Sequence, residues 1–498
     1  MEPEYVITSP SPFGAFQQQP QQQSTVPQHH EADDLSAALL ETSPKEQPPH
    51  HAEPQPEQYR DIWAALVWIL VQLGVLITTA TSHRTGNSTS TSSSLQFIQI
   101  GARSGILLGL VVSALTLTTL LRLAPILVQA SLVLAVGGAA LGTLWVLLSY
   151  GRAWITGGLC GALATLLLWI YARSVWRRVP LAAAYLHMAA AALTASQPAV
   201  WVVAYGCVAV VGIYSRLWGW ECYYTSSSSS SDTGDGSSSS STLLLLAVVL
   251  AYVWTVTVVR NIVHVTVAGA VGTFVWCPQD GTAAHWSVVM DSLVRASTYS
   301  LGSICLGSLL TATVTVAYEG IRWMRRVLVG RRLTAESWLL CVLECLLSFL
   351  HRLMEYFHTY AYVYVALYGY DYLTAGQKVA QLFAERGLTV LVNDDLVQRA
   401  LLLVGGLIGC ITGAVGYVWA STVTQDASWL AFGVPFGMGV AVASIVLRVV
   451  SSAVDTIVVA YTEDPVAFER NHPGYAARIK AAHRQIYPEE VVDLSPTM

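Results

Sequence analysis

An arginine, an amide and an imidazole lie close together at the end of a long apolar run. They are Arg260, Asn261 and His264, and their neighbours are mostly valine, isoleucine and threonine. Polar groups at membrane depth are costly unless they face the protein interior, a water-filled path or the interface. Arg260 and His264 are one helical turn apart, so together they could hydrogen-bond a solute or relay a proton. The alternative is that Arg260 reaches to an interface and a backbone carbonyl satisfies His264.

A second group of side chains is aromatic. Four tyrosines recur at every fourth position and form one helical stripe: Tyr356, Tyr360, Tyr364 and Tyr368. An aromatic wall suits a quaternary ammonium ion, which has no hydrogen-bond donors and is held by cation–π attraction. We expect Trp254 and Tyr299 to join the stripe in such a site. The alternative is an aromatic belt at the membrane interface.

Acidic residues in the same segment are candidates for the counter-charge of a cation. Glu344 or Glu355 could supply it, or could instead pair with His351 and Arg352. Arg448 and Asp455 flank the end of the last apolar run, where we expect an ion pair at the end of a helix. Sequence patterns of catalysis, zinc binding or phosphate binding are weak, so we expect neither an enzyme nor a cofactor or metal site.

The elements that must position these residues are membrane-spanning helices. The 498 residues are 54% hydrophobic and 11% charged, whereas soluble domains carry about 25% charged residues. Several apolar runs approach ~20 residues, the length that spans a bilayer. The sequence predicts an all-α polytopic transmembrane helical bundle with about ten spans. The runs are 62–80, 104–121, 123–148, 153–172, 199–218, 243–263, 298–318, 337–357, 399–420 and 429–450.

The ends of the chain differ from this hydrophobic part. The first 57 residues are rich in Gln, Pro, Glu and His, and such a segment cannot bury enough apolar surface to offset its ordering entropy. We therefore expect a disordered cytoplasmic tail over 1–60, a transmembrane domain over 61–462, and a cytoplasmic C-terminal tail over 463–498.

Orientation in the membrane follows from a glycosylation motif and from charge. Asn87 begins the Asn-X-Ser/Thr motif of the first loop, which would be extracellular. Arg173, Arg177 and Arg178 then lie on the cytoplasmic side, as the positive-inside rule prefers. Ten simple spans, however, put the arginines of 322–332 outside. Either 181–197 also spans, or segments near 298–318 and 337–357 cross only in part.

Three blocks together resemble the choline transporter-like family, in particular its fungal and protist plasma-membrane branch. They are residues 260–272 (RNIVHVTVAGAVG), 295–309 (RASTYSLGSICLGSL) and 361–369 (AYVYVALYG). The resemblance implies about ten helices, cytoplasmic termini and transport of choline or related cations. Two positions depart from the family pattern: Thr257 stands where members often carry a glutamate, and Leu373 replaces a cysteine.

The leading hypothesis is therefore a multi-pass plasma-membrane transporter of choline or a related small organic cation, working by a facilitated or secondary mechanism. Its partners would be the cation and the lipid bilayer, with no nucleic acid. Whether the protein forms a homo-oligomer is left open. Two other classes compete: an intramembrane lipid-metabolic enzyme with His264 as acid or base, and a membrane-organising protein without a solute. Uptake of labelled choline by vesicles containing only this protein separates the first class from the others.

Overall fold

The computed structural model describes residues 58–85, 108–115, short helical pieces between 129 and 144, and then 154–229, 238–276, 285–329, 335–386, 389–424 and 429–486. These residues are helical, with no strand among them, which confirms the predicted all-α class.

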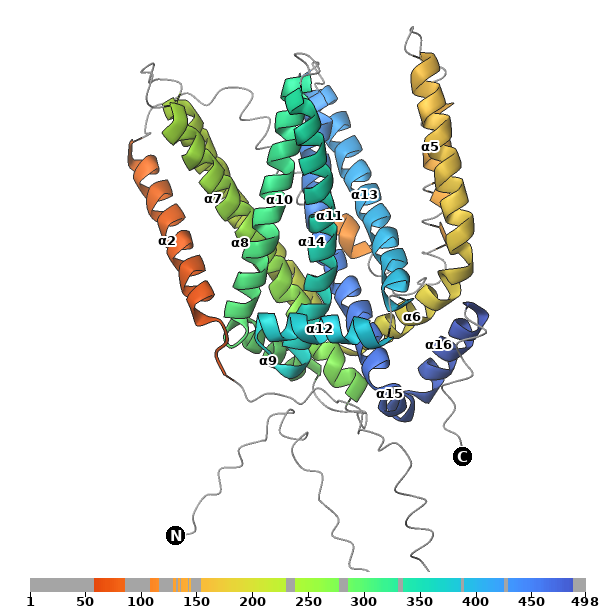
Figure 1. Cartoon of the computed structure of the whole chain (residues 1–498). Coiled ribbons are helices and arrows are strands. Elements are labelled where there is room, and N and C mark those ends of the chain that lie inside the picture. Colours follow the sequence, from red (N-terminus) through yellow and green to blue (C-terminus); the bar gives the residue numbers. More distant parts are fainter. Residues whose placement is uncertain are drawn as a thin grey trace, which may run out of the picture. The chain divides into compact units, whose positions relative to one another are not determined.

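Eight long helices make up most of the described chain (Figure 1). They are α2 (Ile62–Thr85), α5 (Trp154–Val175), α7 (Ala199–Ser229), α8 (Ser238–Trp276), α10 (Leu301–Val329), α11 (Ala335–Tyr368), α13 (Thr389–Thr424) and α14 (Trp429–Glu463). Among the described residues, five segments are long and apolar enough to cross a membrane: Ala199–Trp218, Leu246–Trp276, Leu301–Arg326, Val397–Trp419 and Ala431–Glu463. The second half of the last segment, from Ile445 onward, is almost wholly buried, whereas Phe432 and Ser444 in its first half are exposed, so other helices surround only that second half of α14.

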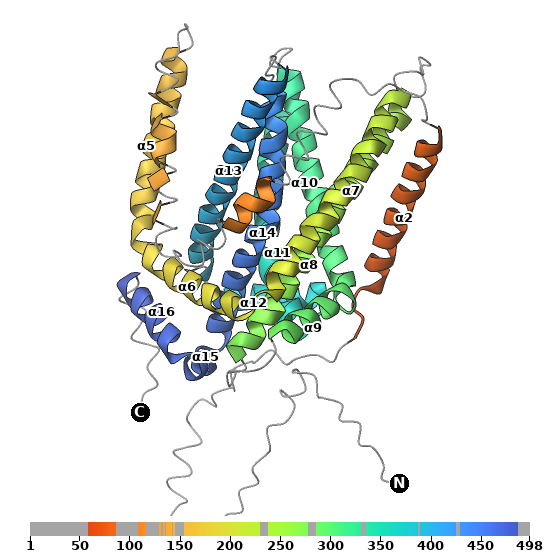
Figure 2. The same ribbon diagram turned by 180° about the vertical axis from the view of Figure 1, so that it is seen from behind.

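Short helices gather at one end of the long ones and run across them (Figures 1 and 2). They are η2 (Trp176–Arg178), α6 (Val179–Ala195), α9 (His285–Ser297), α12 (Tyr372–Arg386), α15 (Pro465–Asn471) and α16 (Pro473–Ile486). Their starts carry the usual signals: α6 has a proline in its first turn, and Asp464 caps α15 by accepting a hydrogen bond from the Ala467 N–H.

Neither explanation offered for the arginines of 322–332 matches the structure. Helix α6 lies at the end of the bundle where α5 ends and α7 begins, so it does not add a crossing (Figure 2). Helices α10 and α11 are unbroken over 29 and 34 residues, so neither is re-entrant. Arg322 and Arg325 therefore lie at the end of the bundle opposite to α6. Pairing with Glu319 and Glu344 lowers the cost of placing them there.

Small residues let α13 and α14 approach closely. Gly409 and Gly413 of α13 face Phe436 and Phe432 of α14, and a Cβ atom at Gly413 would lie only 2.8 Å from the Phe432 ring. A side chain there would push the helices apart, as expected for small residues at four-residue spacing in a membrane.

Candidate functional site

Helix α8 lies at the centre of the bundle and contacts α7, α9, α10, α11 and α14. Its face with Asn261 and His264 is buried: 7% of Asn261 and none of His264 is exposed. The Asn261 amide donates to Ser308 Oγ on α10, at 2.9 Å. Ser308 in turn lies 3.4 Å from the Tyr362 hydroxyl, which donates to the backbone carbonyl of Ile304 at 3.2 Å.

His264 joins three helices. Its Nε2 lies 3.0 Å from the backbone carbonyl of Thr359 on α11, so it can donate to that oxygen. The Ser452 hydroxyl of α14 donates to the backbone carbonyl of His264 at 2.7 Å. The Tyr362 ring meets the imidazole edge-on, with centroids 6.2 Å apart.

A second imidazole lies on the other side of Tyr362. The ring of His358 stacks on that of Tyr362 with centroids 5.9 Å apart, and its Nδ1 is hydrogen-bonded to the hydroxyl of Tyr372 at the start of α12. Tyr362 therefore separates two buried histidines contributed by α8 and α11.

Charged groups reach this region from α14. The Arg448 guanidinium donates to Thr359 Oγ1 and to Ser451 Oγ, both at 3.4 Å. Ser451 also bonds to Asp455 at 3.3 Å, and Gln398 of α13 donates to both Ser451 and Asp455. Asp455 is completely buried. A serine-centred network inside the bundle thus joins the arginine and aspartate that the sequence suggested as an ion pair at the end of a helix.

Three nitrogens of this region are buried and have no hydrogen-bond partner among the described residues: His264 Nδ1, His358 Nε2 and Arg448 Nε. A buried polar atom without a partner costs about 1–3 kcal/mol, so a bond from each of these nitrogens to water or to a solute would be favourable. We call the group His264, His358, Tyr362 and Arg448 the polar centre. Chemically it offers hydrogen-bonding nitrogens, an aromatic face and a charge. His264 and Arg448 lie in segments that are long and apolar enough to cross a membrane.

The predicted aromatic residues fall into separate groups in this conformation. The Trp254 indole is 4% exposed and donates to the carbonyl of Cys305 at 3.0 Å, which joins α8 to α10. Tyr299 lies in the turn before α10, where its ring packs 5.0 Å from that of Tyr59. Tyr360 is fully buried against Phe383 of α12. Their joint role in binding a cation stays a prediction.

The last part of the tyrosine stripe lies beside a carboxylate. The Tyr368 hydroxyl donates to Glu463 Oε2 at 2.6 Å, and the Tyr364 and Tyr370 rings pack 5.6 and 6.0 Å from the Tyr368 ring. We call these four residues the tyrosine–glutamate cluster. It lies where α11 and α14 end.

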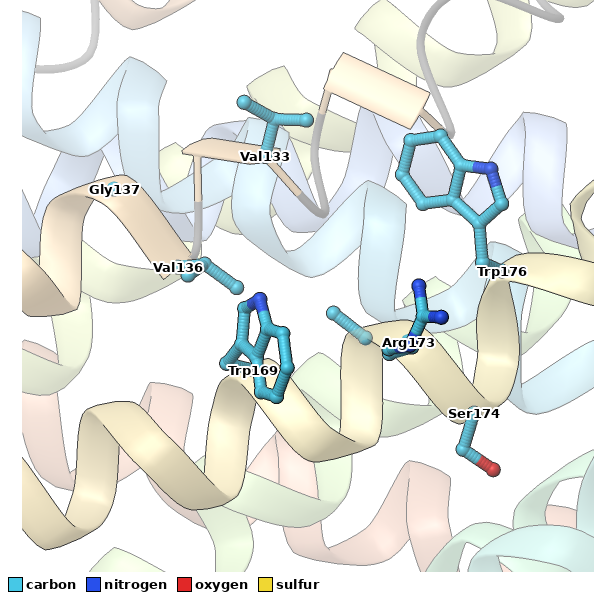
Figure 3. A pocket seen from close by; sticks show the side chains of 8 residues that line it. Val133, Val136, Gly137, Trp169, Arg173, Ser174 and Trp176 are labelled. Atoms are coloured by element: carbon cyan, nitrogen blue, oxygen red, sulfur yellow. The ribbon is translucent and has the colours of Figure 1, made fainter.

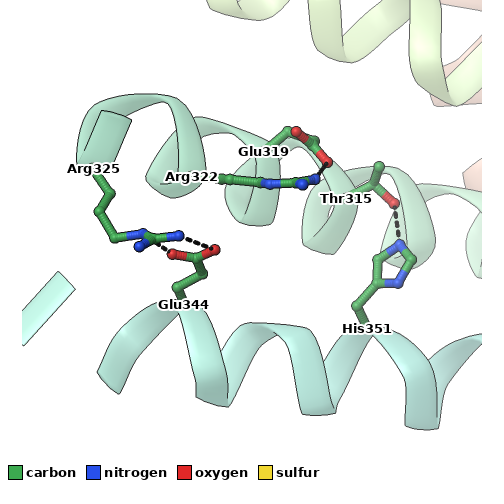
Figure 4. Close-up of polar contacts among 6 residues, drawn as sticks. All are labelled: Thr315, Glu319, Arg322, Arg325, Glu344 and His351. Carbon is green, nitrogen blue, oxygen red and sulfur yellow. Dashed lines mark hydrogen bonds and ion pairs between the residues drawn. The ribbon is translucent and has the colours of Figure 1, made fainter. Parts of the chain in front are cut away.

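The predicted acidic residues lie elsewhere. Glu344 pairs with Arg325 across α10 and α11, and the Arg325 Nη2 atom lies 3.1 Å from a Glu344 oxygen (Figure 4). In the same figure His351 is bonded to Thr315 at 3.2 Å. Glu344 precedes Thr359 by 15 residues, about 22 Å along the helix, so it cannot neutralise charge at the polar centre. The side chain of Glu355 and the whole of Asn87 lie outside the described residues.

Asp61, directly before α2, links the start of that helix to α10 and α12. Asp61 accepts hydrogen bonds from Ser303 Oγ at 2.7 Å and from the backbone N–H of Tyr372 at 3.3 Å. Asp371 caps α12 through the Thr374 N–H. Burial raises the pKa of Asp371, but the hydrogen bonds from Thr374 and the positive charge of Arg60 outweigh burial, and the net pKa is below its ordinary value.

Sequence reasoning missed several of these residues. The spacing of His358 and Tyr362, one helical turn apart in the segment that yielded the tyrosine stripe, is a signal that points to a shared face. No sequence signal marks Ser308, Ser452 or Gln398, because single hydroxyl and amide groups are common in membrane helices.

Comparison with known proteins agrees with the resemblance noted in the sequence. The family model described as "Plasma-membrane choline transporter" matches residues 159–466. The protein named PNS1 of Mycosarcoma maydis is 31% identical over 252 residues, which is 49% of this chain and 46% of that protein. Protein PNS1 of Saccharomyces cerevisiae is 29% identical over 226 residues, 43% and 42% of the two chains. The chain spans about half the length of the curated relatives that it matches.

Proposed function

The chain belongs to the family of plasma-membrane choline transporters, and from this membership we propose that it carries choline or a related small organic cation across the plasma membrane. We further propose that it works by a facilitated or secondary mechanism. The matched residues 159–466 include every residue of the polar centre and of the tyrosine–glutamate cluster.

The observation that carries the proposal is the polar centre itself. Membrane helices rarely contain ionisable residues, and those that occur there mark solute or ion pathways. Here two buried imidazoles and an arginine meet inside the bundle, and one nitrogen of each has no hydrogen-bond partner in the part of the chain that the structure describes. A solute or water that bonds to these nitrogens would remove the cost of leaving them unpaired.

A cation needs negative charge somewhere on its path, and Glu344 is too remote to provide it at the polar centre. Glu463 is a better candidate, because its carboxylate accepts a hydrogen bond from Tyr368, whose ring packs against those of Tyr364 and Tyr370. Tyrosine faces attract a quaternary ammonium by cation–π interaction, and the carboxylate adds counter-charge. We therefore assign the tyrosine–glutamate cluster as a docking point for the cation, leading to the polar centre.

Uptake of labelled choline into liposomes that contain only this purified protein tests the proposal. We expect saturable uptake that unlabelled choline competes for, and none in liposomes without protein. If folded protein gives no uptake above the empty liposomes, the assignment of choline fails.

Two charge-removing variants test the docking point. Glu463→Gln keeps an acceptor for Tyr368 and removes the charge, so the half-saturation concentration should rise about fivefold, as for the loss of about 1 kcal/mol. Glu319→Gln is the matched control, because Glu319 is exposed and pairs with Arg322 near the other end of the bundle. Equal effects of the two variants would refute a specific role for Glu463.

For the orientation, we propose that both termini are cytoplasmic and that the loop 81–103 is extracellular. The support is the Asn87 motif and the basic residues 173–178. Labelling of a tag in the N-terminal tail by an impermeant reagent on intact cells would overturn this orientation.

A further inference from the structure

A pocket of about 880 Å³ lies beside the last turns of α5, away from the polar centre (Figure 3). Its walls are formed by two parts of the chain: Val133, Val136 and Gly137 on one side, and the end of α5 with η2 on the other. It is lined by Val133, Val136, Gly137, Trp169, Ala172, Arg173, Ser174 and Trp176.

The chemistry of the lining is apolar with a single charge. In Figure 3 the Arg173 guanidinium lies between the indoles of Trp169 and Trp176, while the Ser174 hydroxyl points away. Both indoles are about half exposed, at 52% and 47%. Among the described residues the Arg173 side chain is exposed and has no ion-pair partner. Tryptophans with a basic residue at the end of an apolar helix are typical of the level of lipid headgroups.

Further positive charge surrounds this end of α5. Helix η2 follows directly and carries Arg178, and α16 contacts both η2 and α6. Helix α16 is amphipathic: Ile479 is buried, while Arg478 and Arg484 are exposed. A basic amphipathic helix at the end of membrane spans forms a surface that binds anionic lipids by electrostatic attraction.

We propose that the pocket binds an anionic phospholipid of the leaflet in which Arg173 lies, with the phosphate on Arg173 and an acyl chain along Val133, Val136 and Trp169. The volume is within the range of small-molecule sites, about 300–1,000 Å³, so it accommodates a headgroup and the first part of a chain. The transported cation is a poor occupant, because Arg173 repels it. The inference does not depend on which solute is carried.

The test measures thermal unfolding of the purified full-length protein in detergent with three soluble probes. Dioctanoyl-phosphatidylserine has both the anionic headgroup and the chains, dioctanoyl-phosphatidylcholine has the chains with a zwitterionic headgroup, and glycerophosphoserine has the headgroup alone. We expect dioctanoyl-phosphatidylserine to raise the unfolding temperature most at equal concentration. An equal rise with dioctanoyl-phosphatidylcholine, or with glycerophosphoserine, would overturn the proposal.

Variants separate a defined site from a diffuse basic surface. Arg173→Gln should weaken the apparent affinity for dioctanoyl-phosphatidylserine about fivefold, the effect expected for one arginine beside an anionic headgroup. Arg470→Gln is the matched control: it removes the same charge from an exposed position on α15, outside the pocket. Equal weakening by both variants would refute the site. Trp169→Leu should weaken the affinity as well, since it removes an indole from the wall, and unchanged affinity would argue against the placement of the acyl chain.

Discussion

The imidazole of His264 provides the most direct test of the polar centre. His264→Ala removes the group that reaches the carbonyl of Thr359 and leaves that buried oxygen without its partner from α8. This alone should lower the stability by about 1–3 kcal/mol. His264→Gln differs, because the glutamine amide can donate to the same carbonyl and fills most of the same space. We therefore expect the glutamine variant to unfold close to the wild-type temperature and the alanine variant to unfold well below it.

Measuring transport distinguishes a role of the imidazole in the solute path from its role in stability. Glutamine reproduces the bond made by Nε2 but lacks the second nitrogen, Nδ1, for which the described residues supply no hydrogen-bond partner. If Nδ1 bonds the solute or a water on its path, losing that bond should reduce choline uptake about fivefold, for about 1 kcal/mol. Uptake and unfolding are measured on the same preparations.

A neighbouring variant controls for packing. Ser452→Ala removes the hydroxyl that donates to the backbone carbonyl of His264, so it disturbs the same helix contact without touching the ring. It should lower stability by about 1 kcal/mol and leave uptake per folded protein unchanged. The reasoning is refuted if His264→Gln transports at the wild-type rate, or if Ser452→Ala lowers uptake as much as His264→Gln does.

Three further predictions concern other parts of the chain. Tyr364→Leu should weaken choline binding roughly thirtyfold if its ring holds the cation by about 2 kcal/mol, and an unchanged half-saturation concentration in uptake would exclude that role. Asp371 has a lowered pKa, so its stabilisation should be complete above its unfolded pKa, about 4, and be lost as the pH falls through the folded value; the unfolding temperatures of wild type and Asp371→Asn should therefore converge in acid. Asn87→Gln should increase mobility on a gel, and identical mobility would mean that no glycan is attached.

Hydrophobic length was enough to predict the helical class and the approximate position of most long helices, because a bilayer fixes the number of residues that a span requires. Length alone could not assign 181–197, because an alanine-rich apolar segment either crosses a bilayer or packs across the ends of other helices. The structure shows the second arrangement: Leu181, Leu186 and Leu193 of α6 are buried against protein. The positive-inside rule also could not assign Arg325 to one end of the bundle. Its partner Glu344 is distant in sequence and becomes adjacent only when α10 and α11 pack together.

The candidate site was predictable only where its residues share one helix. Spacing grouped Arg260 with His264, since residues four apart share a face. In the structure Asn261 and His264 are buried and Arg260 is half-buried. Which atoms they meet was beyond sequence reasoning, because Thr359 and Ser452 come from α11 and α14. The even spacing of the tyrosine stripe suggested one aromatic wall. Neighbouring helices divide it instead: Tyr360 packs on Phe383 and Tyr368 bonds to Glu463.

The contacts around α8 share a feature that bears on how a transporter could change conformation. His264 bonds to a backbone carbonyl of α11, Trp254 to one of α10, and a hydroxyl from α14 to the carbonyl of His264 itself. A helix presents a similar carbonyl one turn farther along, about 5.4 Å away. A side-chain donor can therefore exchange one carbonyl for the next as helices shift, with little net loss of hydrogen bonding. Contacts between two specific side chains, such as Asn261 with Ser308, have no such substitute and would have to break. If the proposed transport shifts α8 against α10, the bond between Asn261 and Ser308 would have to break, whereas His264 could exchange one carbonyl for the next.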